Sequence, residues 1–142
     1  MNFRRILLGG FLAGLVYNVV EIGVNGAILG AQWKAWQASL GAADQPPAAG
    51  AAMGLWTLIG FGWGFVGAWL YASLRPRFGA GPKTAIVTGL TLWIIGWLFN
   101  ELEQVALGDI PHNLLVGASI AGLVASMVAM LVAGAVYREA TV

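Results

Sequence analysis

Two glutamates, Glu21 and Glu103, each stand inside a long apolar stretch of this chain, and an asparagine precedes each of them by three residues. These asparagines are Asn18 and Asn100. Ionisable side chains are rare in membrane-spanning segments and commonly mark ion or proton pathways there. Carboxylate and amide oxygens also suit hard cations such as Na⁺, Mg²⁺, Ca²⁺ or Mn²⁺. The two Asn-x-x-Glu sequences are therefore candidates for an ion- or ligand-binding site.

A helical wheel gathers the polar residues of each stretch on one arc. These residues are Asn18, Glu21 and Asn25 in the first stretch, and Asn100 and Glu103 in the third. An unpaired polar group facing lipid costs several kcal/mol, so we expect both polar arcs to face the interior of a helix bundle. The wheel turns Glu101 well away from this arc, toward water at the end of its helix.

Glu101, Gln104 and His112 are secondary candidates for ligand binding. His112 lies at the start of the fourth apolar stretch, where it could join Glu103 or Glu101 as a ligand. A lone histidine at an interface is more often a solvated polar residue. The sequence identifies no particular metal, no cofactor and no catalytic residues.

Two buried carboxylates close together cannot both stay ionised without a cation. Glu21 and Glu103 could share a proton and clasp the helices through hydrogen bonds with the asparagines. They could instead bind a hard cation, or hold a proton-coupled or cationic substrate. The clasp is as plausible as the two binding roles together, because interhelical polar contacts are common in membrane proteins.

The pattern Gly-x-aliphatic-aromatic-Asn-x-x-Glu occurs twice, at residues 14–21 and 96–103. Residues 67–71 and 134–137 resemble one another more weakly. The simplest account is a duplicated two-helix hairpin, a parallel 2+2 repeat whose pseudo-two-fold axis runs along the membrane normal. Chance similarity between apolar helices is the alternative, although Asn and Glu are both rare in such helices.

The composition assigns the chain to the membrane proteins. Of 142 residues, 59% are hydrophobic and only 9% are charged, against about 25% charged in soluble domains. The net charge of +1 gives no electrostatic case for nucleic-acid binding. The absence of cysteine excludes disulfides and thiolate chemistry, and the single histidine excludes a bis-histidine haem within one chain.

Four apolar stretches are long enough to cross a bilayer, which takes about 20 helical residues. They cover roughly residues 6–29, 50–74, 84–107 and 111–137. We predict an all-α integral membrane protein, a single domain over residues 1–142 built as a bundle of four transmembrane helices. The second and fourth stretches carry small residues every fourth position, which suits helix packing within the chain or a homo-oligomer.

Basic residues predict the orientation of the helices. In a four-span arrangement one side holds Arg4, Arg5, Arg75, Arg77, Lys83 and Arg138, whereas the other holds only Lys34. Both termini should therefore be cytoplasmic, and we expect a multi-pass protein of the plasma (inner) membrane. Trp33 and Trp36 in the loop 31–49 suggest a short segment at headgroup level.

Three functional hypotheses follow. The short loops and small-residue faces favour a non-catalytic accessory or assembly subunit, with the lipid bilayer, a second copy or a larger membrane complex as partner. The Asn-x-x-Glu pair favours a small cation- or proton-coupled transporter or ligand-binding protein. A membrane enzyme is the third hypothesis, but His-Glu-x-x-His, Gly-x-Ser-x-Gly and Gly-x-Gly-x-x-Gly are all absent from the sequence.

Overall fold

The computed structural model describes residues 1–41 and 49–139, and over these residues the chain is built from helices without strands. The elements in chain order are α1 (Phe3–Ile22), the π-helical turn η1 (Gly23–Ile28), α2 (Gly30–Ser39), α3 (Ala49–Phe78), α4 (Pro82–Trp93), the π-helical turn η3 (Ile94–Leu98), α5 (Phe99–Leu107) and α6 (His112–Val136). The second half of the loop 31–49, with its two prolines, falls largely outside the described residues.

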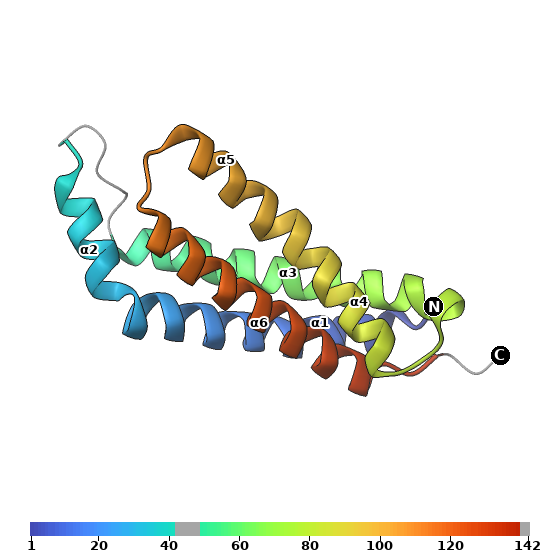
Figure 1. Cartoon of the computed structure of the whole chain (residues 1–142). Helices are drawn as coiled ribbons and strands as arrows, with labels where there is room; N and C mark the ends of the chain where they lie inside the picture. The colour runs from blue at the N-terminus through green and yellow to red at the C-terminus, as the bar shows by residue number, and fades with distance from the viewer. Residues whose placement is uncertain (42–48, 140–142) are drawn as a thin grey trace.

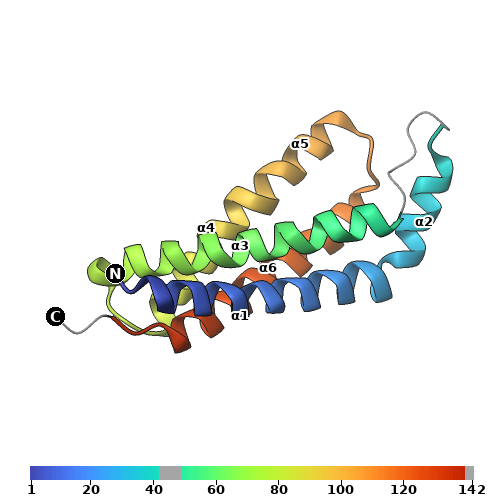
Figure 2. The same cartoon turned by 180° about the vertical axis from the view of Figure 1, so that it is seen from behind.

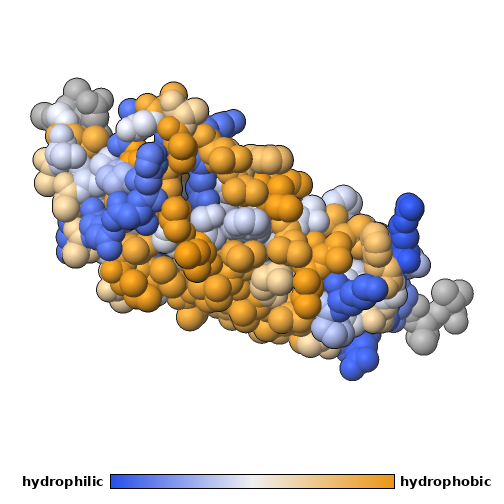
Figure 3. Space-filling view, in the orientation of Figure 1, coloured by the Kyte–Doolittle hydropathy of each residue, from blue (hydrophilic) through white to orange (hydrophobic). Residues whose placement is uncertain are grey.

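Four helical segments of the described chain are long and apolar enough to cross a membrane. They run over Phe3–Ile28, Gly50–Phe78, Pro82–Leu107 and His112–Val136. The predicted all-helical architecture with four spanning segments is therefore confirmed, and the chain is described below as a multi-pass membrane protein. A lipid surround also accounts for the large hydrophobic side chains that cover the middle of the molecule between two hydrophilic ends (Figure 3).

The four long segments form an elongated bundle (Figure 1). Helices α1, α3 and α6 pack together along their length, and α4 packs against α6 and α3. Figures 1 and 2 show the rod of α4, η3 and α5 diverging from the other helices toward the end at which α2 lies. Met1 and Glu139, the first and last described residues, lie together at the opposite end of the bundle, where they form an ion pair.

Close packing of α1 against α3 depends on glycine. A Cβ atom on Gly64 would overlap the backbone of Gly10 and Gly14 on α1. Phe61 and Phe65 of α3 lie directly over these two α1 glycines. Backbones approach this closely only where side chains are small, which is how membrane helices gain packing contacts without help from the hydrophobic effect.

The small residues of α6 pack in the same way. Ala121, Ala125, Ala129 and Ala133 are all buried inside the chain, with exposed fractions of 2% or less. On α3, Ala68 and Ala72 are also buried. These faces therefore serve packing within the chain, one of the two roles that the spacing predicts.

Candidate functional site

Glu21 lies in the last turn of α1, where η1 and α2 hold one of its two carboxylate oxygens. The Asn25 amide donates to Glu21 Oε2 at 2.9 Å and to the Glu21 backbone carbonyl at 3.1 Å. The Trp33 indole N–H from α2 donates in turn to Asn25 Oδ1 at 3.1 Å. This series of hydrogen bonds fixes the direction of the carboxylate.

The other carboxylate oxygen of Glu21 has no hydrogen-bond partner. Oε1 is buried and accepts no hydrogen bond from any described residue. A buried polar atom without a partner is costly, and such atoms in folded proteins call for a specific explanation. A bound proton or cation would supply the missing interaction.

Glu101 provides the second acidic group of the site. It is half-buried on α5, close enough to Glu21 for the two carboxylates to interact electrostatically. The Ser119 side chain of α6 lies near the Glu101 carboxylate and interacts with it. The two carboxylates thus come from different helices, Glu21 from α1 and Glu101 from α5, which packs against α6.

The expectation that Asn100 and Glu103 face the bundle interior is wrong, because both side chains are exposed. The cause is the π-helical turn η3, which lies directly before them. Bonding from residue i to i+5 takes one extra residue into the turn and rotates everything after it by about 100° relative to a regular helix. Glu101 and Gln104, which the wheel does not place on the inner arc, are the half-buried residues of this helix end.

Asn18 has a different role from Asn25. Its amide donates to the Gly14 carbonyl at 2.8 Å and to the Thr57 carbonyl of α3 at 3.2 Å, and the side chain packs against Gly60. Asn18 therefore ties α1 to α3 and directs its donors away from Glu21. This is the clasp role that the sequence leaves open for the asparagines.

An aromatic group lies one helical turn from Glu21, on the side of the buried core. Tyr17 stacks on Trp97 with ring centroids 5.8 Å apart, and Trp63 packs against Trp97 at 5.2 Å. The Tyr17 hydroxyl donates to Ser126 Oγ of α6 at 3.1 Å.

Sequence reasoning misses Tyr17, Ser119 and Ser126 as parts of the site. The only signal for the serines is that they lie seven residues apart and so share one face of α6. Tyr17 fills the aromatic position of the repeated pattern, and an aromatic residue at that position indicates helix packing rather than a functional site. Hydroxyl groups are common in apolar helices, so their types alone do not mark a site.

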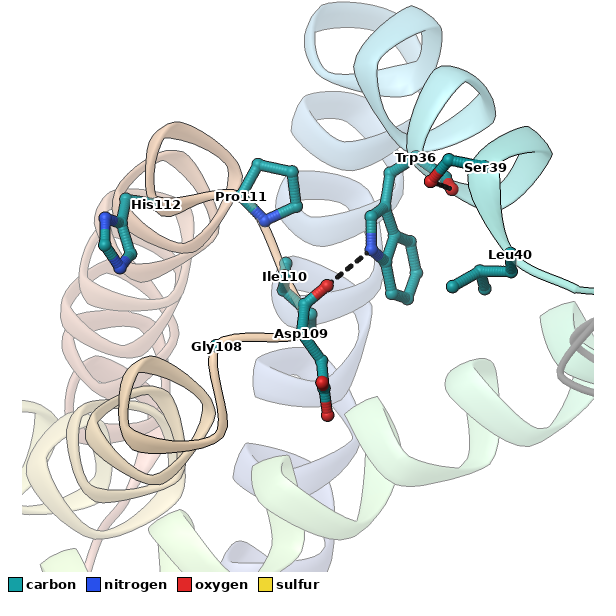
Figure 4. A pocket seen from close by; sticks show the side chains of 8 residues that line it. All are labelled: Trp36, Ser39, Leu40, Gly108, Asp109, Ile110, Pro111 and His112. Carbon is teal, nitrogen blue, oxygen red and sulfur yellow. Dashed lines mark hydrogen bonds between the residues drawn. The ribbon is translucent and has the colours of Figure 1, made fainter.

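His112 does not join the acidic pair. It lies exposed at the start of α6 and lines a separate pocket of about 390 Å³ between α2 and the α5–α6 turn. Figure 4 shows the Trp36 indole reaching this turn, where its N–H donates to the Asp109 carbonyl at 2.8 Å, with His112 on the far side. Over the described residues, no group of three or more His, Cys, Asp or Glu side chains is placed to hold a metal ion.

The chain matches no protein-family model, and comparison with curated proteins and with solved structures finds no match. A function for this protein therefore has to be argued from the chemistry of the site itself.

Proposed function

We propose that this is a small membrane transporter or ligand-binding protein that takes up a proton or cation at the Glu21–Glu101 pair and couples it to a small solute. The observation that carries the proposal is the buried, unpartnered Oε1 of Glu21 beside a second carboxylate. A structural clasp would satisfy both oxygens with hydrogen bonds, as Asn25 satisfies Oε2.

The π-helical turns next to Glu21 and Glu101 support a site whose geometry can change. One π-helical turn begins two residues after Glu21, and the other ends three residues before Glu101. Such turns occur often at functional sites, because they weaken the regular hydrogen bonding of the helix. Neither these turns nor α5 contains a fully buried residue, and a shift of this end would have to break the ring contacts of Trp97 with Tyr17 and Trp63.

The proposal includes a parallel repeat of two hairpins. In its favour, α1 and α4, the first helices of the two hairpins, each pack against both α3 and α6. Against a strict repeat, the aligned residues Glu21 and Glu103 lie in different surroundings. A duplicated hairpin whose second copy carries its π-helical turn before the acidic residue accounts for both observations.

We further propose that both termini are cytoplasmic and that the membrane is the plasma (inner) membrane. The basic residues at the end of the bundle that holds both termini support this orientation. Lys34, on α2 at the other end, is the exception. In this orientation the acidic pair lies nearer the outer surface.

An assembly subunit is the second candidate. The first half of α3 exposes Leu55, Trp56 and Leu58 at 60–70%, and α5 exposes Phe99 and Leu102 at 56–57%. Lipid covers such faces in a monomer, but a partner helix or a second copy would also fit them. On this hypothesis Glu21→Gln would leave the function intact, and the protein would purify with its partner under gentle conditions.

The first experiment is a thermal-stability scan in detergent, across pH and with Na⁺, Mg²⁺, Ca²⁺ or Mn²⁺, of the wild type, Glu21→Gln and Glu101→Gln. A ligand at about 100 times its Kd adds about 2.7 kcal/mol of stability, enough for a measurable rise in Tm. We expect one cation, or protonation, to stabilise the wild type, and both substitutions to abolish the response.

Glu103→Gln is the matched control, since it removes an exposed glutamate from the same helix. It should respond like the wild type. A wild type whose Tm no cation and no change of pH alters, or a Glu103→Gln variant that loses the response while Glu101→Gln keeps it, would contradict the proposed site. The hypothesis that the protein is an assembly subunit would then be favoured.

A further inference from the structure

Helix α2 is joined to the acidic site by an unbroken series of hydrogen bonds. The Trp33 indole N–H donates to Asn25 Oδ1 at 3.1 Å, and the Asn25 amide donates to Glu21 Oε2 at 2.9 Å. An indole N–H can only donate a hydrogen bond, and an ionised carboxylate can only accept one. The amide between them must therefore turn its oxygen to Trp33 and its nitrogen to Glu21, so the state of the carboxylate bears on the position of α2.

Other side chains of α2 are joined to the α5–α6 turn and to the start of α6. The Trp36 indole N–H donates to the Asp109 carbonyl of the turn at 2.8 Å (Figure 4). The Asn113 amide of α6 donates to Gln32 Oε1 of α2 at 2.7 Å. Within α2, Trp36 packs against Trp33 in a T-shaped arrangement, with ring centroids 5.7 Å apart. The two indoles thus connect the carboxylate site with the α5–α6 turn.

The attachment of α2 to this turn is weak enough to be reversed. No residue of α2, all of which the structure describes, is buried, and both hydrogen bonds to α6 and its preceding turn lie at the exposed surface. Before α2 the chain bends at Leu29, whose side chain is 7% exposed and packs over Gly117 of α6. Hinges are commonly a few residues at the end of an element. Leu29 therefore holds the end of η1 on α6, while α2 beyond it can swing.

We propose that α2 is a lid at its end of the bundle. It stays docked on the α5–α6 turn while Glu21 holds a proton or a cation, and it leaves the turn when Glu21 is ionised and empty. The inference rests on the proposed function, because it takes the acidic pair as the binding site and names how that site opens to the α2 end. Undocking widens the pocket of about 390 Å³ between α2 and the turn into an entrance for the solute.

The driving force is the buried oxygen of Glu21. With a proton or a cation bound, Oε1 has its partner and Oε2 still accepts from Asn25, so the series of hydrogen bonds to α2 is complete. Without one, a charged oxygen stays buried without a hydrogen bond, which costs more than a few surface hydrogen bonds between neutral groups contribute. Water must then reach Oε1. Helix α2 gives way more easily than α5, because the ring contacts of Trp97 hold the α5 side.

The other ionisable groups near Glu21 are few. Tyr17 on its own helix and Glu101 on α5 interact with it electrostatically. Both α3 and α4 carry their ionisable side chains at the far end of the bundle. Over the described residues, the remaining ionisable side chains at this end are exposed: Lys34 on α2, Glu103 on α5, Asp109 in the turn and His112 on α6. His112 lines the same pocket as Trp36, so the test includes a control for its titration.

The test measures the distance between α2 and α6 in the full chain in lipid nanodiscs, by pulsed electron paramagnetic resonance between two spin labels. The sequence has no cysteine, so the labels are attached at Ala38→Cys on α2 and Val116→Cys on α6, both exposed positions. In a buffer without metal cations, we expect one short distance in acid, where Glu21 is protonated, and a second, longer distance at alkaline pH. Val19→Cys with Val116→Cys is the control pair, whose distance should not change because α1 and α6 pack together.

Four further substitutions in the labelled protein assign the change. Glu21→Gln removes the charge and keeps the size, so the short distance should persist at every pH, whereas His112→Gln should respond like the wild type. At the pH where half of the wild type is docked, Trp36→Phe should lower the ratio of docked to undocked molecules about fivefold, the effect of one hydrogen bond between neutral groups. Trp93→Phe is the matched control, since it removes an indole-to-carbonyl hydrogen bond of 3.0 Å between α4 and Ser119, and it should leave that ratio unchanged.

The proposal is overturned if the wild-type distance does not change with pH, if Glu21→Gln changes as the wild type does, or if His112→Gln abolishes the change. Equal shifts in Trp36→Phe and Trp93→Phe also overturn it, and this comparison decides alone if Glu21→Gln does not fold. The stability response in detergent is measured separately on unlabelled protein. A response that persists there while the α2 distance stays fixed rejects the lid alone, whereas the loss of the response rejects the acidic site.

Discussion

At the scale of single residues, the surroundings of a carboxylate decide what it can do. Glu21 has one oxygen held by Asn25 and one buried without a partner, whereas Glu103 is exposed on α5. The same residue type is thus a candidate binding group in one place and a surface residue in the other. Burial with incomplete hydrogen bonding separates the two.

A third glutamate, Glu139, lies beyond the spanning segments at the end that holds the termini. Its carboxylate pairs with the Met1 ammonium at 3.1 Å and with Arg75 at 3.1 Å, and Tyr137 hydrogen-bonds to it. The hydrogen bond from the Met1 ammonium, followed by the other partners, holds the pKa of Glu139 below its ordinary value of 4.5. These contacts join the N-terminus, the end of α3 and the C-terminal segment.

Because the folded state lowers this pKa, the stabilisation by Glu139 is present above about pH 4.5 and is lost as the pH falls through the folded pKa. Glu139→Gln should therefore lower Tm slightly at neutral pH, and its difference from the wild type should vanish in acid. The measurement is Tm against pH for both proteins in detergent. A difference that persists undiminished in acid would show that the carboxylate charge is not its cause. The effect is small because the group is exposed.

At the scale of elements, the π-helical turn η3 sets which face of α5 points inward. Gly96 lies within this turn, and the Trp63 ring packs against it, 2.8 Å from where a Cβ would stand. A wheel drawn through residues 84–107 assumes one continuous α-helix and so assigns Glu103 to the interior. The extra residue in η3 moves each inner position on by one residue, so Glu101 takes the place expected for Asn100, and Gln104 takes the place expected for Glu103.

Packing of α3 against α1 allows a sharp test. Gly64→Ala should destabilise the protein by about 1–3 kcal/mol, because its Cβ overlaps the α1 backbone and the two helices must separate. Gly62→Ala is the control two residues away, where nothing lies within 4 Å. That substitution should be neutral, or stabilising by up to about 1 kcal/mol through helix propensity. Equal losses of Tm in the two variants would contradict the close α1–α3 contact.

At the scale of the whole molecule, the position of the acidic pair depends on how the two hairpins meet. Helices α1, α3 and α6 pack along their length, while α5 diverges toward the α2 end (Figures 1 and 2). Glu21 and Glu101 lie toward the diverging end of the bundle, where η1, η3 and α5 hold no buried residue.

The absence of cysteine from the sequence makes the orientation easy to test. With both termini cytoplasmic, Ser39→Cys at the end of α2 should react with a membrane-impermeant thiol reagent in intact cells. Ala80→Cys in the α3–α4 turn should react only after permeabilisation. Both side chains are exposed in the structure, so access and not burial decides the result. The reverse labelling pattern would show that the basic residues do not predict the orientation here.

The sequence by itself determined the number of spanning helices, their approximate ends and the membrane class. These follow from the length and hydropathy of continuous stretches, which are local properties. It also singled out Glu21, because α1 is regular up to that residue and η1 begins only after it. Only the tertiary structure decided that Glu101 rather than Glu103 faces Glu21, and that Tyr17, Ser119 and Ser126 surround them. The physical reason is that the rotation of α5 depends on the hydrogen bonding of η3 and on the packing of Trp63 at Gly96, neither of which a periodic pattern records.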